Sequence, residues 1–405
     1  MVNIMSKQAL FLRVAIGFLL GIALGLFAPE FSIATKVVGD IYLNLIKLMI
    51  IPIIVCAVFG GIANIEDSNL LRRIGLRTVL LYLVLFVLSA ILSLAIAYLI
   101  RPGKGIVFTH NPVYEGDLVN PTVSSFLTNI VPSNIFASFA EGQTLPVILF
   151  TIAIALAVLY IGPSGKPVLD FMNSISKVMF KILDWIMELS PLGVLSLMAY
   201  SVAQYGSGIF GPLAKYILTC WICCLAIFIF VFLLPTVLIS KVPIKVFLKA
   251  CAKVALVTMS TTSSAATLPT TLQVSVDDLR APKAISQFTL PLGSTINMCG
   301  GAVSFCCLAV FVSDFYALSL GFETIVFLIF VATLINMAAP GIPGGGIVLG
   351  ASFLSLIGLP IDLMGPISGF YRLLDMAFTT INVEGDIVAN LLISKNVGEY
   401  DFYSK

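Results

Sequence analysis

The sequence predicts an all-helical (all-α) integral membrane protein with eight transmembrane helices and two re-entrant helical hairpins. Composition is the first reason: 59% of the 405 residues are hydrophobic and 10% are charged, whereas a soluble domain has about 25% charged residues. A soluble chain of this length could not bury so much apolar surface. The second reason is the order of the apolar runs, which are long and regular at first and interrupted in the last third.

Six long apolar runs come first, each long enough to cross the hydrocarbon core, which takes about 20 residues. We expect the first, at about 9–28, to be a transmembrane helix and not a cleaved signal, because no A-x-A site follows it. A polar loop from Arg101 to about Asn129 separates the third and fourth runs, and we expect the fourth to be broken or kinked near Pro132 and Pro146. The six predicted helices lie at about 9–28, 36–63, 75–100, 130–161, 168–205 and 212–240.

The last third contains two interrupted segments, 243–278 and 320–358, in which small and polar residues break up the apolar runs. Each is followed by a predicted helix, at about 282–313 and 360–395. Non-helical backbone at membrane depth is tolerated only inside protein or beside a water-filled cavity. Paired interruptions of this kind indicate re-entrant hairpins in an internal repeat, and they point to the binding site of a transporter.

The basic residues predict the orientation in the membrane. One cluster follows the second predicted helix and another follows the sixth: Arg72, Arg73 and Arg77, then Lys241, Lys245, Lys249 and Lys253. Because such clusters favour the cytoplasmic side, we expect a multi-pass protein of the cell (inner) membrane with a cytoplasmic N-terminus. The net charge of +2 forms no basic stripe, so nucleic acid is not an expected partner.

Other function classes find little support. The eight cysteines include Cys220, Cys223 and Cys224, which lie in an apolar run without a second CxxC pair, so we expect small buried side chains. The single histidine, His110, excludes a His-based catalytic triad or His-rich metal site. No base or metal cluster accompanies the serines, so an enzyme is not expected. An ion channel is not expected either, because the chain lacks rings of charge and a repeated filter motif.

Four polar residues share one face of the last predicted helix, at about 100° per residue: Asp375, Thr379, Asn382 and Asp386. Two carboxylates within a membrane helix cost a few kcal/mol each, and they mark functional sites by default. The alternative is a structural ion pair between Asp375 and Arg372. The Thr and Asn between the acids add oxygen ligands, which favours a binding site.

The segments around this helix supply complementary groups. Asn297, Thr295 and the backbone of Gly293 offer uncharged oxygens, and together with one carboxylate they suit a hard monovalent cation such as Na⁺. Ser263 and Ser264 lie where one hairpin would turn, and a half-helix N-terminus there would favour a carboxylate. Glycines 341 and 344–346 permit the second hairpin to bend.

Four motifs resemble those of the dicarboxylate/amino acid:cation symporter family, the glutamate transporter family. They are SSAATLP at 263–269, FTLPLGSTINM at 288–298, GIPGGG at 341–346 and DMAFTTINVEGD at 375–386. The resemblance covers essentially the whole chain and implies a homotrimer in the lipid bilayer. A trimeric scaffold would comprise 1–74 and 101–206. A moving transport domain would comprise 75–100, 207–242 and 243–405.

The resemblance also implies residue roles. Asp375 would hold the amino group of the substrate, and Asn382 and Ser264 its α-carboxylate. The substrate pocket would comprise Ser263, Ser264, Gly301, Ile342, Gly346, Asp375, Phe378, Thr379 and Asn382. A first Na⁺ site would use Gly293, Asn297, Asn382 and Asp386. A second would use Thr295, Met298, Asn336, Met337 and Ala339.

One departure from the family bears on the substrate. Members that carry acidic amino acids have an arginine three residues after the substrate aspartate, where this chain has Phe378. The hairpin arginine of archaeal members is Thr262 here. A side-chain carboxylate left unpaired in a desolvated pocket costs several kcal/mol. The expected substrate is therefore an amino acid or dicarboxylate of the family type, with a neutral amino acid favoured unless Arg372 replaces the missing guanidinium.

A second departure bears on the coupling ion. In the family motif NMDGT, Cys299 replaces the aspartate and Gly301 the threonine. On the third helix Tyr82 matches a ligand of a third sodium, but Leu85 and Phe86 replace the expected hydroxyl residues. We expect the third site to be absent. The sequence thus predicts a symporter driven by Na⁺, with H⁺ as an open alternative. A non-transporting sensor or an anion-conducting channel of the same fold remains the rival.

Overall fold

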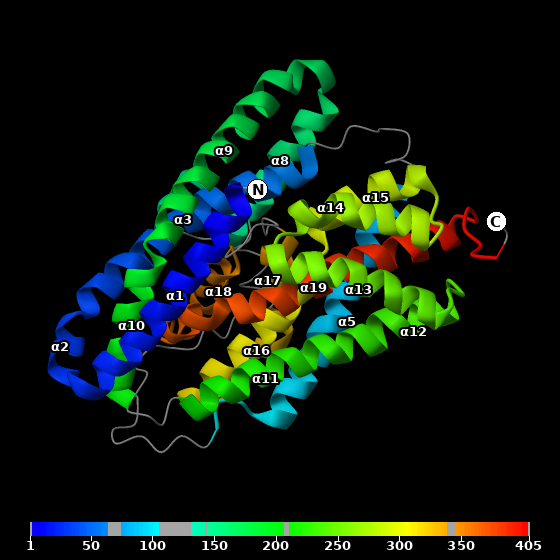
Figure 1. The fold of residues 1–405 in the computed structure, drawn as a ribbon. Coiled ribbons are helices and arrows are strands. Elements are labelled where there is room, and N and C mark those ends of the chain that lie inside the picture. The colour runs from blue at the N-terminus through cyan, green and yellow to red at the C-terminus, as the bar shows by residue number, and fades with distance from the viewer. Residues whose placement is uncertain are drawn as a thin grey trace.

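The computed structural model describes residues 2–63, 74–104, 131–141, 144–205, 210–337 and 345–403. Most of these residues are helical, and no strand occurs among them (Figure 1). The helices form two groups that meet along one long helix near the C-terminus. The predicted 3–4 loop lies, beyond residue 104, outside the described residues.

The first helix group comes from two parts of the chain, residues 2–63 and 135–205. Its helices are α1 (Val2–Phe27), α2 (Pro29–Ala34), α3 (Lys36–Ala63), α7 (Ile135–Glu141), α8 (Thr144–Tyr160), α9 (Lys166–Glu188) and α10 (Ser190–Tyr205). The N-terminal helix α1 packs along α10, and α3 contacts α8, α9 and α10.

The second helix group surrounds a 33-residue helix, α19 (Met364–Asn396), most of whose residues are buried. One span runs from residue 210 to residue 238 through a widened π-helical stretch, Phe228–Leu233. The other helices of the group are α5 (Leu76–Ile100), α11 (Phe210–Ile227), α12 (Leu234–Leu238), α13 (Ile244–Thr261), α14 (Ser264–Gln273), α15 (Lys283–Ile296), α16 (Cys299–Phe315), α17 (Phe322–Met337) and α18 (Gly345–Leu356).

Several helices of the described chain are candidate membrane spans. Four segments of the described chain are long and apolar enough to cross a membrane, and a bent pair could form a fifth span. These are Leu76–Ile100, Phe210–Leu238, Lys283–Phe315 and Met364–Asn396, and the bent pair Gly162–Ile186 with Ser190–Gln204. Shorter apolar stretches are Leu12–Phe27 within the 26-residue α1, Ile51–Gly60 within the 28-residue α3, Leu149–Tyr160, Phe322–Asn336 and Gly346–Leu356.

Both interrupted segments fold as two helices. The first consists of α13 and α14, which pack against each other and are joined at Thr262, a residue in left-handed conformation with φ 46°. Ser263 caps α14, because its Oγ accepts the backbone N–H of Ala266 at 3.3 Å. We call α13 and α14 the first helix pair. The second segment consists of α17 and α18, whose connection at 338–344 lies outside the described residues.

Two helices that the sequence predicts as continuous are broken. The helix predicted at 168–205 divides into α9 and α10, because Pro191 has no N–H to continue the ladder. The helix predicted at 282–313 divides into α15 and α16, because the backbone leaves the helical region at Asn297 and Met298. The helix predicted at 130–161, expected to be broken or kinked near Pro132 and Pro146, is divided into α7 and α8, and Pro146 lies in the first turn of α8, where proline is tolerated.

Glycines allow helices to pack closely at two places. Gly17, Gly21 and Gly25 form a stripe on α1, and a Cβ at any of them would overlap atoms of α10. Such small-residue stripes allow close backbone approach in membranes. On α19, a Cβ at Gly365 or Gly369 would overlap side chains of α10 and α1. Glycines therefore form much of the contact between the two helix groups.

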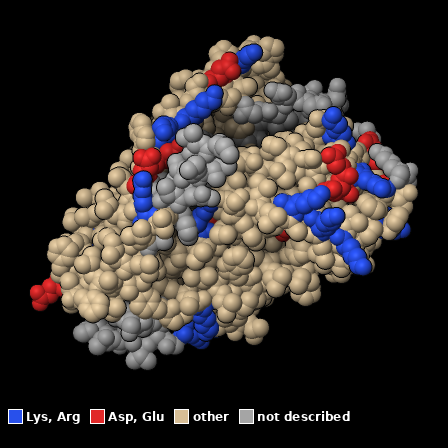
Figure 2. Space-filling view, viewed as in Figure 1, with Lys and Arg blue, Asp and Glu red and all other residues tan. Residues whose placement is uncertain are grey.

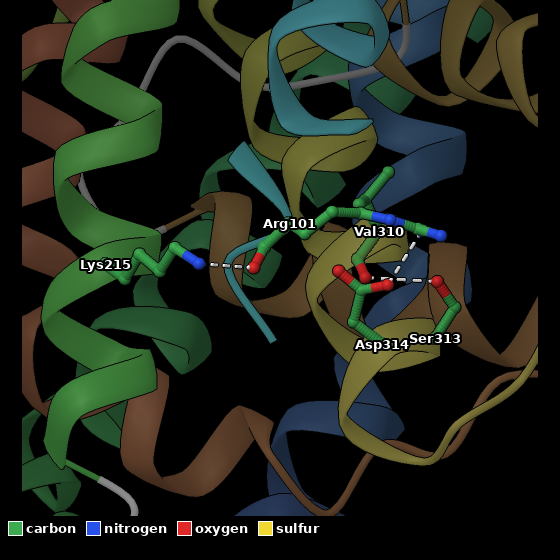
Figure 3. A network of polar contacts seen from close by, with 5 residues as sticks. All are labelled: Arg101, Lys215, Val310, Ser313 and Asp314. Carbon is green, nitrogen blue, oxygen red and sulfur yellow. Dashed lines mark hydrogen bonds and ion pairs between the residues drawn. The ribbon is translucent and has the colours of Figure 1, made fainter. Parts of the chain in front are cut away.

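Polar contacts fasten one end of the second group (Figure 3). Arg101, just beyond α5, donates from Nη1 to Asp314 Oδ1 at 2.8 Å, and Lys215 Nζ donates to the Arg101 carbonyl at 2.8 Å. The Asp314 side chain is 2% exposed, whereas that of Arg101 is 35% exposed. Three helices, α5, α11 and α16, are thus joined at one point.

The surface fits a lipid environment. On the face drawn in Figure 2, charged side chains are sparse and most of the described surface is uncharged. Large apolar side chains are exposed on several helices, among them Leu76 at 72%, Leu256 at 75% and Phe322 at 80%. Exposed apolar side chains on several helices fit a membrane or protein partner.

Candidate functional site

The predicted polar face of α19 lies inside the second helix group. Asp375, Thr379 and Asp386 are buried, and Asn382 is half-buried. Thr379 Oγ1 donates to Asp375 Oδ1 at 3.5 Å across one helical turn. Four residues selected by helical spacing alone therefore do share one buried face.

The break between α15 and α16 lies against this face. Asn297 Nδ2 donates to Asp386 Oδ1 at 2.9 Å, and a Cβ at Gly293 would overlap the same carboxylate oxygen. Asn382 Oδ1 accepts the backbone N–H of Gly300 at 2.7 Å, which satisfies one of the unpaired donors at the start of α16. The break therefore brings together residues that the sequence analysis assigns to a first Na⁺ site: Gly293, Asn297 and Asp386 are in contact, and Asn382 precedes Asp386 by one turn on α19.

The second predicted Na⁺ site is described in part. Asn336 Nδ2 donates to the Met298 carbonyl at 2.6 Å, so the end of α17 is tied to the same break. Asn382 Nδ2 lies 3.3 Å from the Met298 sulfur. Thr295 is half-buried, and its hydroxyl donates to the Leu292 carbonyl at 2.8 Å. Of the other two residues, Met337 ends α17 and Ala339 lies outside the described residues.

A cavity of about 500 Å³, its opening included, adjoins these contacts. Its walls come from α14, the α15–α16 break, α17, α18 and α19. The lining residues are Thr262, Ser264, Met298, Gly301, Ser304, Phe305, Asn336, Gly346, Leu349, Tyr371, Asp375, Phe378, Thr379 and Asn382.

Most predicted pocket residues line this cavity. Ser264, Gly301, Gly346, Asp375, Phe378, Thr379 and Asn382 do so, whereas Ser263 instead caps α14 and Ile342 lies outside the described residues. Sequence reasoning missed Ser304, Phe305, Leu349 and Tyr371. Tyr371 precedes Asp375 by four residues, so helical spacing could have identified it. The other three come from neighbouring helices, and only the tertiary fold brings them to the cavity.

The described lining of the cavity contains few ionisable side chains. Among its described lining residues, Asp375 is the one ionisable carboxylate, and there is no Lys, Arg or His. Arg372 directs its guanidinium to the first helix pair, where it donates to Thr262 Oγ1 and, at 2.8 Å, to the Ser260 carbonyl. Phe378 is 3% exposed, and its ring centroid lies 6.3 Å from that of Tyr371. This part of the wall is therefore aromatic.

Comparison with known proteins gives matches over nearly the whole chain. The model of the sodium:dicarboxylate symporter family matches residues 10–396. A proton/sodium-glutamate symport protein of Geobacillus stearothermophilus is 30% identical over 98% of this chain and 96% of its own length. A C4-dicarboxylate transport protein of Pseudomonas fluorescens (strain Pf0-1) is 29% identical over 97% of this chain and 90% of its own.

Proposed function

Because the chain belongs to the sodium:dicarboxylate symporter family, we propose that this membrane transport protein couples Na⁺ entry to uptake of an amino acid with a neutral side chain. The observation that carries the neutral cargo is the charge of the cavity. Its described lining holds one carboxylate and no basic side chain. A dicarboxylate would bring two negative charges to this wall, and an acidic amino acid would leave one unpaired. H⁺ remains the alternative coupling ion.

The arrangement of polar groups suits the backbone of an α-amino acid. Asp375 binds the ammonium group. The α-carboxylate lies between Asn382 and Ser264, where the N-terminus of α14 adds unpaired backbone N–H groups and a favourable helix dipole. Phe378 and Tyr371 enclose the side chain of the substrate. Binding of this kind uses a few polar groups for orientation and apolar surface for the remainder.

Two Na⁺ ions accompany each substrate in this proposal. The first is held by Gly293, Asn297, Asn382 and Asp386, and the second by Met298, Thr295 and the end of the α17 segment. A third site receives no support, because Leu85 and Phe86 are buried apolar side chains and the Cys299 thiol donates to Asn297 Oδ1 at 3.4 Å. Sulfur and apolar groups are poor ligands for a hard cation.

We place these sites in a homotrimer with eight spans and two re-entrant hairpins in each subunit. The scaffold comprises residues 1–74 and 101–206, and the transport domain comprises 75–100, 207–242 and 243–405. The packing of the helices into two groups supports this division (Figure 1). Alternating access then follows from movement of the loaded transport domain against the scaffold, in a cell membrane with the N-terminus inside.

Uptake by purified protein in liposomes tests the proposal. Serine, alanine, leucine, aspartate, glutamate and succinate are offered with Na⁺ and pH gradients imposed separately. We expect Na⁺-driven uptake of a neutral amino acid. Selective high-affinity uptake of aspartate or a dicarboxylate would refute the neutral cargo, and the absence of concentrative uptake would refute the symporter.

A variant sharpens the result. Phe378→Arg adds a guanidinium to the cavity wall, and a charge-assisted hydrogen bond contributes about 1.5–3 kcal/mol. The ratio of aspartate to alanine uptake should therefore rise roughly 10- to 150-fold. Phe378→Met keeps the wall apolar and is the matched control, for which we expect little change in this ratio.

A further inference from the structure

The joint of the first helix pair is held from outside by one side chain. At Thr262 the backbone turns through a left-handed conformation, and its N–H donates to the Thr258 carbonyl at 2.7 Å. Arg372, on α19, donates one guanidinium nitrogen to Thr262 Oγ1 and another to the Ser260 carbonyl. The planar guanidinium of Arg372 thus connects α19 to two residues at the C-terminal end of α13, Ser260 and Thr262.

The position suits an arginine for two reasons. The last four carbonyls of a helix have no partner within the helix, and Ser260 contributes one of these in α13. The C-terminus of a helix also carries a partial negative charge, which a cation stabilises. Arg372 therefore acts as a C-terminal cap supplied by another helix. The fork of its donors lets it reach two acceptors, which the single ammonium of a lysine does less well.

The joint is also part of the substrate cavity. Thr262 and Ser264 line it, whereas Arg372 does not. Arg372 instead reaches the cavity wall from outside, through the hydroxyl of Thr262, whose residue is 1% exposed. Another side-chain bond between α13 and α19 joins Thr258 Oγ1 to Thr380 Oγ1 at 2.7 Å. Thr258 precedes the joint by four residues, so this bond holds α13 one turn before its C-terminal end and does not hold the joint itself.

We propose that Arg372 is a positioning residue for substrate binding: by holding the Ser260–Thr262 joint against α19, it places the N-terminus of α14 over the cavity. The effect on substrate rests on the proposed function, whereas the effect on the joint does not. Arg372 thereby determines affinity without contacting the substrate, and its engagement excludes it as a substitute for the guanidinium missing at Phe378.

Hydrogen exchange of the backbone amides tests the contact in purified protein without substrate. In Arg372→Gln, exchange over residues 259–268 should be at least about tenfold faster than in the wild type, with an intermediate value for Arg372→Lys. Arg77→Gln is the matched control, since Arg77 donates to Asn396 Oδ1 at 3.2 Å far from the joint in sequence. Unchanged exchange at 259–268, or equal acceleration throughout α13, would overturn the proposal.

Uptake kinetics test the consequence for substrate. Arg372→Gln should raise KM about tenfold while Vmax changes by less than about twofold. Thr262→Ala removes only one partner and should raise KM in the same direction, and the double variant should be no worse than Arg372→Gln alone. Additive effects, or a fall in Vmax at constant KM, would overturn the positioning role. If the wild type transports no amino acid, the proposed function fails, but the exchange measurement still decides whether Arg372 holds the joint.

Discussion

Gly301 offers a direct test of how the α15–α16 break is held together. The family threonine is absent at this position, and the structure supplies a reason: a Cβ at Gly301 would overlap Asn336 Oδ1. The Met298 carbonyl accepts both the Gly301 N–H at 2.8 Å and Asn336 Nδ2 at 2.6 Å. Gly301→Ala therefore forces Asn336 to rotate and to lose its bond to Met298.

The magnitude follows from these contacts. A buried donor left without a partner costs about 1–3 kcal/mol, while alanine recovers up to about 1 kcal/mol of helix propensity in α16. The net loss is about 1–2 kcal/mol. Because Met298 and Asn336 belong to the proposed second Na⁺ site, a loss of this size at that site corresponds to roughly 5- to 30-fold weaker Na⁺ binding.

The assay is the thermal unfolding of purified protein over a range of Na⁺ concentrations, because a bound ion raises the unfolding temperature by mass action. Gly301→Ala should shift the half-saturating Na⁺ concentration upward by the stated factor. Gly211→Ala is the matched control, since a Cβ at Gly211 meets nothing within 4 Å. In Gly301→Ala/Asn336→Ala the overlap is gone, so this variant should match Asn336→Ala. Unchanged Na⁺ dependence in Gly301→Ala, or additive losses in the pair, would refute the reasoning.

Three further outcomes are expected. Asn297→Ala removes the donor to Asp386, a bond to a charged group that contributes about 1.5–3 kcal/mol, so half-maximal uptake should need roughly 10- to 150-fold more Na⁺; an unchanged requirement would contradict the first site. The reversal potential of transport in liposomes should give fewer than three Na⁺ per substrate, and a ratio of three would restore the third site. Asp314→Asn removes the charge that Arg101 pairs with and should lower the unfolding temperature more than Asp40→Asn, because Asp314 is 2% exposed and a hydrogen bond to a charged group is worth about 1.5–3 kcal/mol, whereas one partner of an exposed pair is worth about 0–1 kcal/mol; equal shifts would argue against a stabilising link between α5 and α16.

Hydropathy predicts the regular helices well because lipid contact imposes continuous apolar runs. The helix expected at 36–63 ends where α3 ends, and the one expected at 75–100 differs from α5 by one residue at its start. The break at Asn297 and Met298 lies within 293–301, where small and polar residues interrupt the apolar run, but these residues do not show at which position the helix ends. The backbone groups at the break are satisfied by Asn382 and Asn336, which come from distant helices.

The site was predictable to the extent that it follows helical periodicity. Asp375, Asn382 and Asp386 share a face because 3.6 residues make a turn, and the structure keeps them there. The partners of Arg372 were not predictable. Its spacing to Asp375 indicates an ion pair, but among the described residues its bonds go to Ser260 and Thr262, which only the fold places within reach.

The glycines of α19 have a mechanical consequence. At Gly365 and Gly369 the first helix group rests on bare backbone, because a side chain at either position would overlap its neighbours. Interlocked side chains resist displacement, since each must leave its groove before the helices can shift. At this contact the side chains of Leu197 and Phe18 occupy the space that a Cβ of Gly365 or Gly369 would take, and the Phe18 ring also packs edge-on against Phe370 with ring centroids 6.2 Å apart, so a shift of one group past the other requires these side chains to leave their grooves.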